Sequence, residues 1–538
     1  MPNRIGGSVD LRPNLNCEQG AEGEISIGML ASSLTARIAA SPRFVMSLSA
    51  RVSYIDQLYK WLLKGNDSQI SYNFRDFNVS ARYCPDSLNT FQFVAFHSGD
   101  KINYFDGHYA LDSDIKWYNS MASLKWKHQG HISMSNRIDF TEFKNRLVLD
   151  MSQLKVDAPS RLRRLGLSGD FVVKGKKSLT QIDAGYELSQ YLSVPLYAYV
   201  EGYGVSEPSV ACRNSKATEV RVYGDAKIDM GHNLELKAGV SASYYHNGSY
   251  NTGAFDPRIT LIWLHDRHTL SFHIGSYHQY LQQTGLSEIG LASDSWYLAS
   301  RVINPVTSAG INSEYLFNTG FENIEISADA YWRHIQNQAE YDGSLLDLAN
   351  NDYVAEEQLI SSSGFNSGYS IGLQRNIGTL TGSLSYSYDM AMRHFPQHKG
   401  WLHARTDPGH SFKANLDYRI SEKWNVGAQF SFASGRTYTP IKSIYVIAEN
   451  LICIYGDRNS ARLPSYQRLD FSGTYSFVMR MGKRALDSQI NLSLINAYGH
   501  RNIEMQTFII NPDNGRYKLV KYSSLYRFLP SLSFTIKF

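Results

Sequence analysis

Four histidines and one tryptophan gather in the short stretch MRHFPQHKGWLHARTDPGH, where imidazole and indole rings could contact a ligand. These residues are His394, His398, Trp401, His403 and His410. The proline, glycine and charged residues between them are typical of a loop, and binding residues are often placed on loops. We therefore predict a candidate ligand-recognition loop here, and a loop that is simply solvated is the alternative.

Other histidines give weaker indications of metal chemistry. His273 and His278 in HIGSYHQ are five residues apart, so a strand would direct them to opposite faces. His265 and His268 flank an expected tight turn, for which an ordinary polar surface turn is the alternative to a metal site. We predict no metal site and no cofactor.

Catalysis receives little support from the sequence. It contains no GxSxG elbow, no HExxH motif and no glycine-rich phosphate loop in a strand-to-helix context. A serine, a histidine and an acid can still meet in space without sequence order, as in hydrolases that act at the rim of a β-barrel. Such enzymes use smaller barrels than a chain of 538 residues would build. We therefore assign no catalytic residue and predict that the protein is not an enzyme.

An ion pair is predicted in the segment ARLPSYQRLD. Arg468 and Asp470 are two residues apart and share one strand face, where they alternate with Leu469 and Phe471. We interpret their face as the lumenal wall of a barrel, with the two charges paired to each other or to a segment inside the lumen. A contact with substrate is the alternative.

The segments around these candidates alternate between apolar and polar residues, as strands with two different faces do. In TLTGSLSYSYD, leucines and tyrosines fall on one parity while serines and threonines fall on the other. The segments LELKAGVSASYY, FENIEISADAYWRH and DSQINLSLIN repeat the pattern. We place about twenty such segments of roughly ten residues, the length that a tilted strand needs to cross a bilayer.

The connections between these segments alternate in length. Short turns include QG at 129–130, MGHN at 230–233 and NIG at 376–378, whereas longer polar stretches lie near 56–70, 203–216, 281–295, 338–367 and 391–409. This alternation predicts an all-β fold, a transmembrane antiparallel β-barrel of about 22 strands with short periplasmic turns and long extracellular loops. A soluble sandwich or propeller is the alternative, although no period of about 40 to 50 residues is visible.

Composition excludes other classes. No run of about 18 to 20 apolar residues is present, which excludes a helical membrane protein, and the aromatic content of 13% suits membrane boundaries. The four cysteines are scattered without a CxxC pair, which argues against a zinc ribbon or a disulfide-dense fold. A net charge of +4 without a basic cluster gives no reason to expect a nucleic-acid partner.

Several segments resemble TonB-dependent outer-membrane receptors, and they occur in the same order along the chain. They are PNRIGGSVDLRPN, GEISIGMLASSLTARI, AFDPRITLIW, SFHIGSYHQ, GYSIGLQRNIGTLTGSLSYSYDMAMR, KWNVGAQFSFASGRTYTP, YGDRNSARLPSYQRLDFSGTYSF, NLSLINAYGHRN and LPSLSFTIKF. The resemblance covers nearly the whole chain. It implies a remnant of the plug domain at residues 1–17 and a receptor-type barrel at residues 18–538.

The resemblance implies an outer-membrane receptor for energised uptake of a scarce, bulky nutrient such as a ferric siderophore, cobalamin or an oligosaccharide. MPNRIGGSVDLRPN lacks the features of a signal peptide, so we expect a truncated or mis-started reading frame. The TonB complex is then an expected partner only if a plug and a coupling segment are supplied upstream. A passive outer-membrane pore without a plug is the alternative function.

The last segment of the chain places large apolar residues on one parity, namely Leu532, Phe534, Ile536 and Phe538. A final strand that ends in Phe resembles the signal that the barrel-assembly machinery reads in outer-membrane barrels. An ordinary last strand is the alternative. The expected partners are therefore outer-membrane lipid, the barrel-assembly machinery and an unidentified nutrient ligand.

Overall fold

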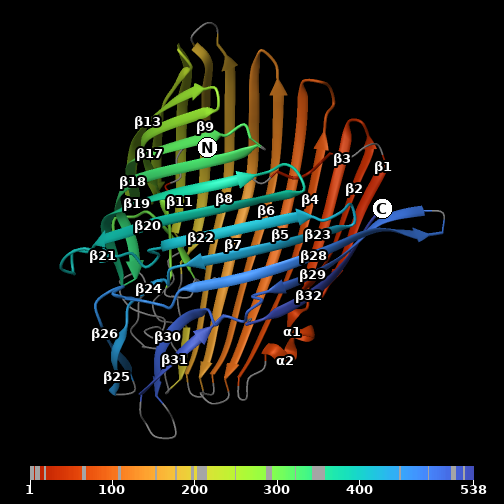
Figure 1. Cartoon of the computed structure of the whole chain (residues 1–538). Coiled ribbons are helices and arrows are strands. Elements are labelled where there is room, and N and C mark those ends of the chain that lie inside the picture. Colours follow the sequence, from red (N-terminus) through yellow and green to blue (C-terminus); the bar gives the residue numbers. More distant parts are fainter. Residues whose placement is uncertain are drawn as a thin grey trace.

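The computed structural model contains one large antiparallel sheet that closes on itself as a barrel (Figure 1). The closed sheet has 22 strands, which confirms the predicted transmembrane β-barrel. The structure describes residues 5, 12–16, 20–63, 68–106, 111–151, 154–175, 179–195, 199–202, 215–248, 250–285, 294–321, 323–341, 358–447, 450–482, 484–510, 517–524 and 527–538.

Each barrel strand pairs with its neighbours in the chain. The barrel strands are β1 (Gly20–Gly28), β2 (Ala31–Ser41), β3 (Phe44–Ser53), β4 (Ser68–Tyr83), β5 (Asn89–Asp106), β6 (Leu111–Gln129), β7 (Ile132–Met151), β8 (Leu154–Lys174), β9 (Leu179–Val194), β11 (Ser215–Gly231), β12 (Leu234–Asn247), β13 (Tyr250–His265), β14 (His268–Gln279), β17 (Val306–Asn318), β18 (Ile324–Tyr341), β19 (Leu359–Arg375), β20 (Leu380–His394), β22 (Gly409–Arg419), β23 (Trp424–Ala433), β28 (Tyr466–Met481), β29 (Arg484–Ile495) and β32 (Leu529–Lys537).

Smaller elements lie in the connections at one rim. They are α1 (Ile55–Leu58), α2 (Lys60–Leu63), β10 (Tyr199–Gly202), β15 (Leu281–Thr284), β16 (Ser295–Leu298), β21 (Leu402–His403), β24 (Thr437–Tyr438), β25 (Ile441–Ile447), β26 (Asn450–Tyr455), β27 (Ala461–Arg462), β30 (Ile503–Ile510) and β31 (Tyr517–Ser523). Figure 1 shows the helices and the hairpins β25–β26 and β30–β31 at the same end of the barrel. Among the described residues, no helix is both long and apolar enough to span a bilayer.

The two rims differ as the sequence predicts. The turns MGHN and NIG join β11 to β12 and β19 to β20 at one rim, and we call it the short-turn rim. The connections at the opposite rim include residues 280–305, 395–408, 434–465 and 496–528, and we call it the long-loop rim. The apolar stretch IKSIYVIAENLICIY forms the hairpin β25–β26 at that rim and takes no part in the barrel wall.

The chain ends meet where the barrel closes. Strand β1 pairs with β32 in antiparallel register, with Ile25 opposite Ile536 and Ile27 opposite Phe534. Gly23 and Phe538 exchange two backbone hydrogen bonds of 2.6 and 2.9 Å. Because a Cβ atom at position 23 would overlap the Phe538 ring, only glycine leaves this ring room to cover β1.

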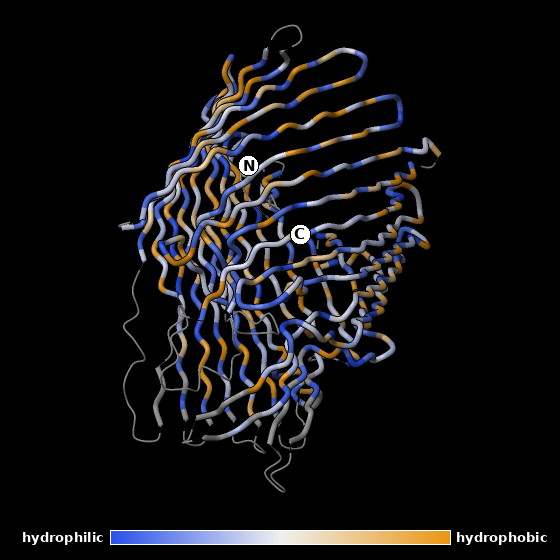
Figure 2. Tube along the Cα trace, turned by 90° about the vertical axis from the view of Figure 1, so that its left-hand side faces the viewer, coloured by the Kyte–Doolittle hydropathy of each residue, from blue (hydrophilic) through white to orange (hydrophobic). Residues whose placement is uncertain are grey.

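The two faces of each strand differ in character, and Figure 2 shows hydrophobic and hydrophilic residues alternating along the strands. Large apolar side chains such as Phe255 and Ile274 are exposed on the outward parity. Charged residues such as Asp225 and Arg258 are paired at 2.5 Å on the other parity, which faces the lumen. Aromatic rings flank the apolar belt, as in the Trp424–Tyr475 contact with 4.8 Å between centroids. This layout is that of a lipid-embedded barrel with a polar interior.

Candidate functional site

The long-loop rim encloses a cavity of about 310 Å³, which we call the loop cavity. Four segments far apart in sequence line it: the connection between β15 and β16, the end of β18, and the loops that follow β20 and β23. The polar lining includes Gln283, Asp294, Gln338, Glu340, Tyr341, His398, Arg405, Tyr438, Tyr455 and Arg458. Its volume lies at the lower end of the range for small-molecule sites, about 300 to 1,000 Å³.

Two arginines hold the walls of the loop cavity together. Arg405 donates a hydrogen bond of 2.5 Å from Nη1 to the carbonyl oxygen of Gly285, and its Nη2 lies 3.8 Å from Asp294 Oδ2. Arg458 donates from Nη2 to Glu340 Oε2 at 3.1 Å and to the carbonyl oxygen of Tyr341 at 2.6 Å. The planar guanidinium group recognises carboxylate and other oxyanions well, so the cavity presents two groups suited to an oxygen-rich ligand.

The hairpin β15–β16 folds against the inner side of the barrel wall. Its backbone accepts hydrogen bonds from side chains of two barrel strands, namely Asn145 Nδ2 to Asp294 O at 2.9 Å and Ser193 Oγ to Trp296 O at 2.5 Å. The Tyr245 hydroxyl of β12 donates to Ala299 O at 3.0 Å. One wall of the loop cavity is therefore fixed to the barrel itself.

A pH dependence is predicted for this docked hairpin. Burial raises the pKa of Asp294, and the opposing effect of Arg405 is smaller. A carboxyl group whose pKa is higher in the folded state stabilises that state when protonated, and this contribution is lost as the pH rises from about 3.9 through the raised pKa. We expect the protection factors of the β15–β16 amides, which correct for the faster intrinsic exchange at higher pH, to be larger at pH 4 than at pH 7. Asp294→Asn should remove this difference, and a difference that persists in the variant would assign it to another group.

The residues of the predicted recognition loop lie on two different sides of the barrel wall. His398 lines the loop cavity, and its ring lies 6.0 Å from that of Phe395. His394 and Trp401 contact each other at 6.0 Å between centroids, and Trp401 also contacts Phe365, which has the outward parity of β19. His410 lies within β22, where its ring is 4.7 Å from that of Tyr388.

His403 contacts the buried carboxylate of Asp407. Its Nδ1 lies 2.9 Å from Asp407 Oδ2, which also pairs with Arg462. The other carboxylate oxygen, Asp407 Oδ1, accepts the backbone N–H of Ala391 at 2.6 Å. Because Asp407 is 2% exposed and joins three segments, it organises the loops that form the cavity. The sequence gives no periodic signal for this role.

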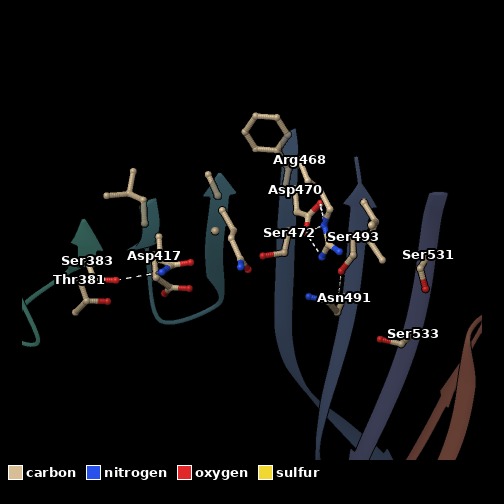
Figure 3. Close-up of a pocket in the computed structure, with 18 of the residues that line it drawn as sticks. Thr381, Ser383, Asp417, Arg468, Asp470, Ser472, Asn491, Ser493, Ser531 and Ser533 are labelled. Atoms are coloured by element: carbon tan, nitrogen blue, oxygen red, sulfur yellow. Dashed lines mark hydrogen bonds and ion pairs between the residues drawn. The ribbon is translucent and has the colours of Figure 1, made fainter. Parts of the chain in front are cut away.

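A second cavity lies on the lumenal wall between β19 and β1 and has a volume of about 710 Å³. Small polar side chains line most of it, as Figure 3 shows for Ser383, Ser472 and Ser493. Arg468 and Asp470 lie side by side on β28, with Nη2 and Oδ2 2.5 Å apart. These two residues therefore share the lumenal face and contact each other, while a functional role for the pair stays a prediction.

Asp470 has a structural task as well. Its Oδ1 accepts the backbone N–H of Asn496 at 2.8 Å, at the point where the chain leaves β29 for the last long loop. Asn496 has a positive φ of 53°, a conformation that asparagine tolerates better than most residues. The carboxylate therefore anchors the start of this loop in addition to pairing with Arg468.

Part of the N-terminal segment contacts the lumenal wall at two distant places. The carbonyl oxygen of Ile5 accepts a hydrogen bond of 3.0 Å from Arg333 of β18. Leu15 is 4% exposed and packs with Ala39 and Val45 of β2 and β3. Residues 1–4, 6–11 and 17 lie outside the described part of the chain, so the assignment of residues 1–17 as a plug remnant stays a prediction.

The terminal strand directs the four predicted assembly-signal residues outward. Leu532 and Phe538 are exposed, and Phe534 stacks on Phe477 with 6.4 Å between centroids. Recognition of this face by an assembly machinery stays a prediction. Within the described residues there is no group of three or more histidine, cysteine or acidic side chains that could hold a metal ion.

Comparison with known proteins places this geometry in a family. The family model described as TonB dependent receptor-like, beta-barrel, matches residues 41–498. No curated protein matches the sequence. Several solved structures match the fold.

The unliganded ferric citrate transporter FecA is 14% identical with a TM-score of 0.65, covering 96% of this chain and 78% of FecA. The ferric-catecholate import receptor Fiu from E. coli K12 is 12% identical with a TM-score of 0.62, covering 97% of this chain and 81% of Fiu. The FrpB iron transporter from Neisseria meningitidis is 11% identical with a TM-score of 0.63, covering 97% of this chain and 82% of FrpB. With its closed barrel and a family match over most of its length, the chain belongs to the TonB-dependent receptor family, whose barrels lie in the bacterial outer membrane.

Proposed function

We propose that this barrel is the receptor for an oxygen-rich, anionic iron chelate and that the loop cavity is where the chelate first binds. The observation that carries the proposal is the convergence of Arg405, Arg458 and His398 with tyrosine hydroxyls and amides in one cavity at the long-loop rim. Carboxylate, catecholate and hydroxamate oxygens on such a chelate would accept hydrogen bonds from these groups. FecA, Fiu and FrpB, which have the same fold, are described as iron or ferric-chelate transporters, and this supports the proposal.

Cobalamin and neutral oligosaccharides are the competing ligands. Cobalamin is much larger than a cavity of about 310 Å³, and a neutral sugar gains less from two guanidinium groups than an anionic chelate does. After binding, the chelate would pass along the polar lumenal wall that carries Arg468 and Asp470. In this proposal, TonB is the partner of a plug and a coupling segment that precede the barrel. The outward face of β32 is the surface that the barrel-assembly machinery recognises.

The test is equilibrium binding of ferric citrate and a ferric catecholate to the refolded chain, followed by quenching of tryptophan fluorescence. We expect Arg405→Gln and Arg458→Gln each to weaken binding about 10- to 100-fold, because a hydrogen bond to a charged group contributes about 1.5 to 3 kcal/mol. Tyr438→Phe, which removes one hydroxyl group only, should weaken it a few-fold.

The matched control is Arg419→Gln, which removes an exposed arginine at the short-turn rim. Its affinity should equal that of the unchanged protein. Folding of every variant is verified by heat-modifiable migration in gel electrophoresis, since folded barrels migrate differently from unfolded chains. Tight binding of cobalamin or an oligosaccharide with no binding of either iron chelate would reject the proposed ligand class.

A further inference from the structure

The outer surface of β4 to β8 carries a dense group of cations close to the long-loop rim, which we call the outer basic patch. It consists of Arg75, Lys101, Lys116, Lys144, Arg146, Arg161 and Arg163, together with the carboxylates Asp114, Glu142 and Asp157. These side chains lie on the outward face of their strands, because they have the same parity as the exposed apolar residues of the same strands. The patch therefore faces away from the lumen and from both cavities.

Residues that pair directly across neighbouring strands form rows, and the register of β4 to β8 shows a sharp boundary between apolar and cationic rows. One row across the five strands is wholly apolar and consists of Val79, Ala95, Ala122, Phe140 and Leu165. The next row contains Phe77, His97, Ser120, Glu142 and Arg163, and the row after it contains Arg75, Gly99, Tyr118, Lys144 and Arg161. The following row adds Lys101, Lys116 and Arg146. The cations thus begin within one or two rows of the last lipid-facing side chains.

Strand length places the outer basic patch at the membrane surface. Strands β5, β6, β7 and β8 have 18, 19, 20 and 21 residues, whereas a tilted strand needs about 9 to 11 residues to cross the hydrocarbon. These strands must therefore extend past the apolar rows, and the first polar rows lie beside the lipid head groups. Tyr118, whose ring stacks on His97 at 6.4 Å, occupies the same position, as expected for an interfacial aromatic residue.

Cations outnumber carboxylates within the patch, and single carboxylates serve several of them. Glu142 pairs with Lys144 at 3.0 Å, with Arg161 at 2.5 Å and also with Arg163. Asp114 pairs with Lys116 at 2.9 Å and Lys101 at 3.5 Å, and Arg146 pairs with Asp157 at 2.5 Å. The side chains of Lys144, Arg146 and Arg163 nevertheless remain 41–57% exposed. The acidic residues Asp112 and Asp150 mark the edge of the patch toward the rim.

We propose that the outer basic patch binds phosphate groups of an anionic lipid in the outer leaflet of the membrane. Arginine pairs and lysine are the side chains that best match phosphate oxygens, and their attraction to anionic head groups is about 1 kcal/mol for each cation. Exposed apolar residues directly below the cations would contact the acyl chains of the same lipid. Lipid binding at this patch is independent of the loop cavity and of the nutrient that the receptor carries.

The test uses the full chain in a neutral detergent and follows lipid adducts by native mass spectrometry. Dioleoyl phosphatidic acid is the probe, and dioleoyl phosphatidylcholine is the comparison lipid. The unchanged protein should bind the anionic lipid in preference. The triple variant K144Q/R161Q/R163Q should weaken its binding on the order of 100-fold, which is the factor that three cations at about 1 kcal/mol each would give.

Two further variants distinguish recognition from general charge or misfolding. R419Q/K423Q/R480Q removes three exposed cations at the short-turn rim and should leave lipid binding unchanged. Glu142→Gln frees the three cations that share this carboxylate and should strengthen lipid binding several-fold, which a merely destabilised barrel would not do. Equal binding of phosphatidic acid by the unchanged protein and the triple variant would overturn the proposal. Complete competition by millimolar inorganic phosphate would also overturn it, because the patch would then bind the free anion.

Discussion

Replacing Gly435 with alanine is expected to open the loop that follows β23 and to detach Arg458 from the loop cavity. A Cβ atom at position 435 would overlap the backbone carbonyl group of Leu463, and a backbone atom cannot move aside as a flexible side chain can. Because the backbones at Gly435 and Leu463 approach so closely, Leu463 N can donate to Arg436 O at 2.9 Å, and β24 can pair with β27. We expect a cost of about 3 kcal/mol, the upper end for inserting a methyl group into a packed site.

The measurement is hydrogen exchange of peptides from β24 and β27. A cost of about 3 kcal/mol should accelerate the exchange of their amides about 100-fold, while the barrel strands keep their protection. Gly473→Ala in β28 is the matched control, because a Cβ atom there would meet no neighbour within 4 Å. Unchanged exchange in Gly435→Ala would mean that the close backbone contact is not what holds this loop.

Removal of the Asp407 carboxylate should disorder the rim more widely. The carboxylate joins the end of β20, His403 and Arg462, so Asp407→Ala leaves Ala391 N–H without its acceptor and Arg462 without its counter-charge. The side chains of Arg462 and His403 are 35% and 43% exposed, so this loss should cost less than the about 3 to 5 kcal/mol of a fully buried ion pair. We expect rapid proteolysis in residues 395–408 and weaker ligand binding, with an intact barrel.

The control for this variant is Asp417→Asn. Asp417 lies on β22 and is exposed, and it lines the second cavity, of about 710 Å³, on the lumenal wall. Asp407→Asn gives a graded comparison, since the amide oxygen can still accept the Ala391 N–H. Resistance of Asp407→Ala to protease, equal to that of Asp417→Asn, would contradict the organising role that the geometry gives to Asp407.

The barrel could be predicted from the sequence because the patterns that determine its strands and turns are local. A period of two in runs such as TLTGSLSYSYD decides which side chains face lipid, and turn residues such as those of MGHN decide where the chain reverses. The positive φ angles of Gly231, His232 and Asn233 show how this turn is made. Arg468 and Asp470 could be placed on one face by the same parity rule, and they do contact each other.

The loop cavity could not be predicted, because its walls come from residues as far apart as Asp294 and Arg458. Their meeting depends on how each loop folds against the wall, and no periodic pattern encodes that. The histidine-rich stretch shows the limit clearly. Parity could have placed His410 beside Tyr386 and Tyr388 on the outer face, since β22 pairs His410 with Tyr388. Of the five candidate recognition residues in that stretch, His398 lines the cavity, whereas Arg405, which was not a candidate, lines it as well.

The most direct test of iron-chelate binding in the loop cavity is a crystal structure of the refolded chain soaked with ferric citrate and measured at the iron absorption edge. Anomalous scattering locates iron without any assumption about the ligand. We predict one iron peak within the loop cavity, between Arg405 and Arg458, and its loss in crystals of the Arg458→Gln variant. A peak confined to another part of the barrel, or no peak at saturating chelate, would contradict binding of the chelate in the loop cavity.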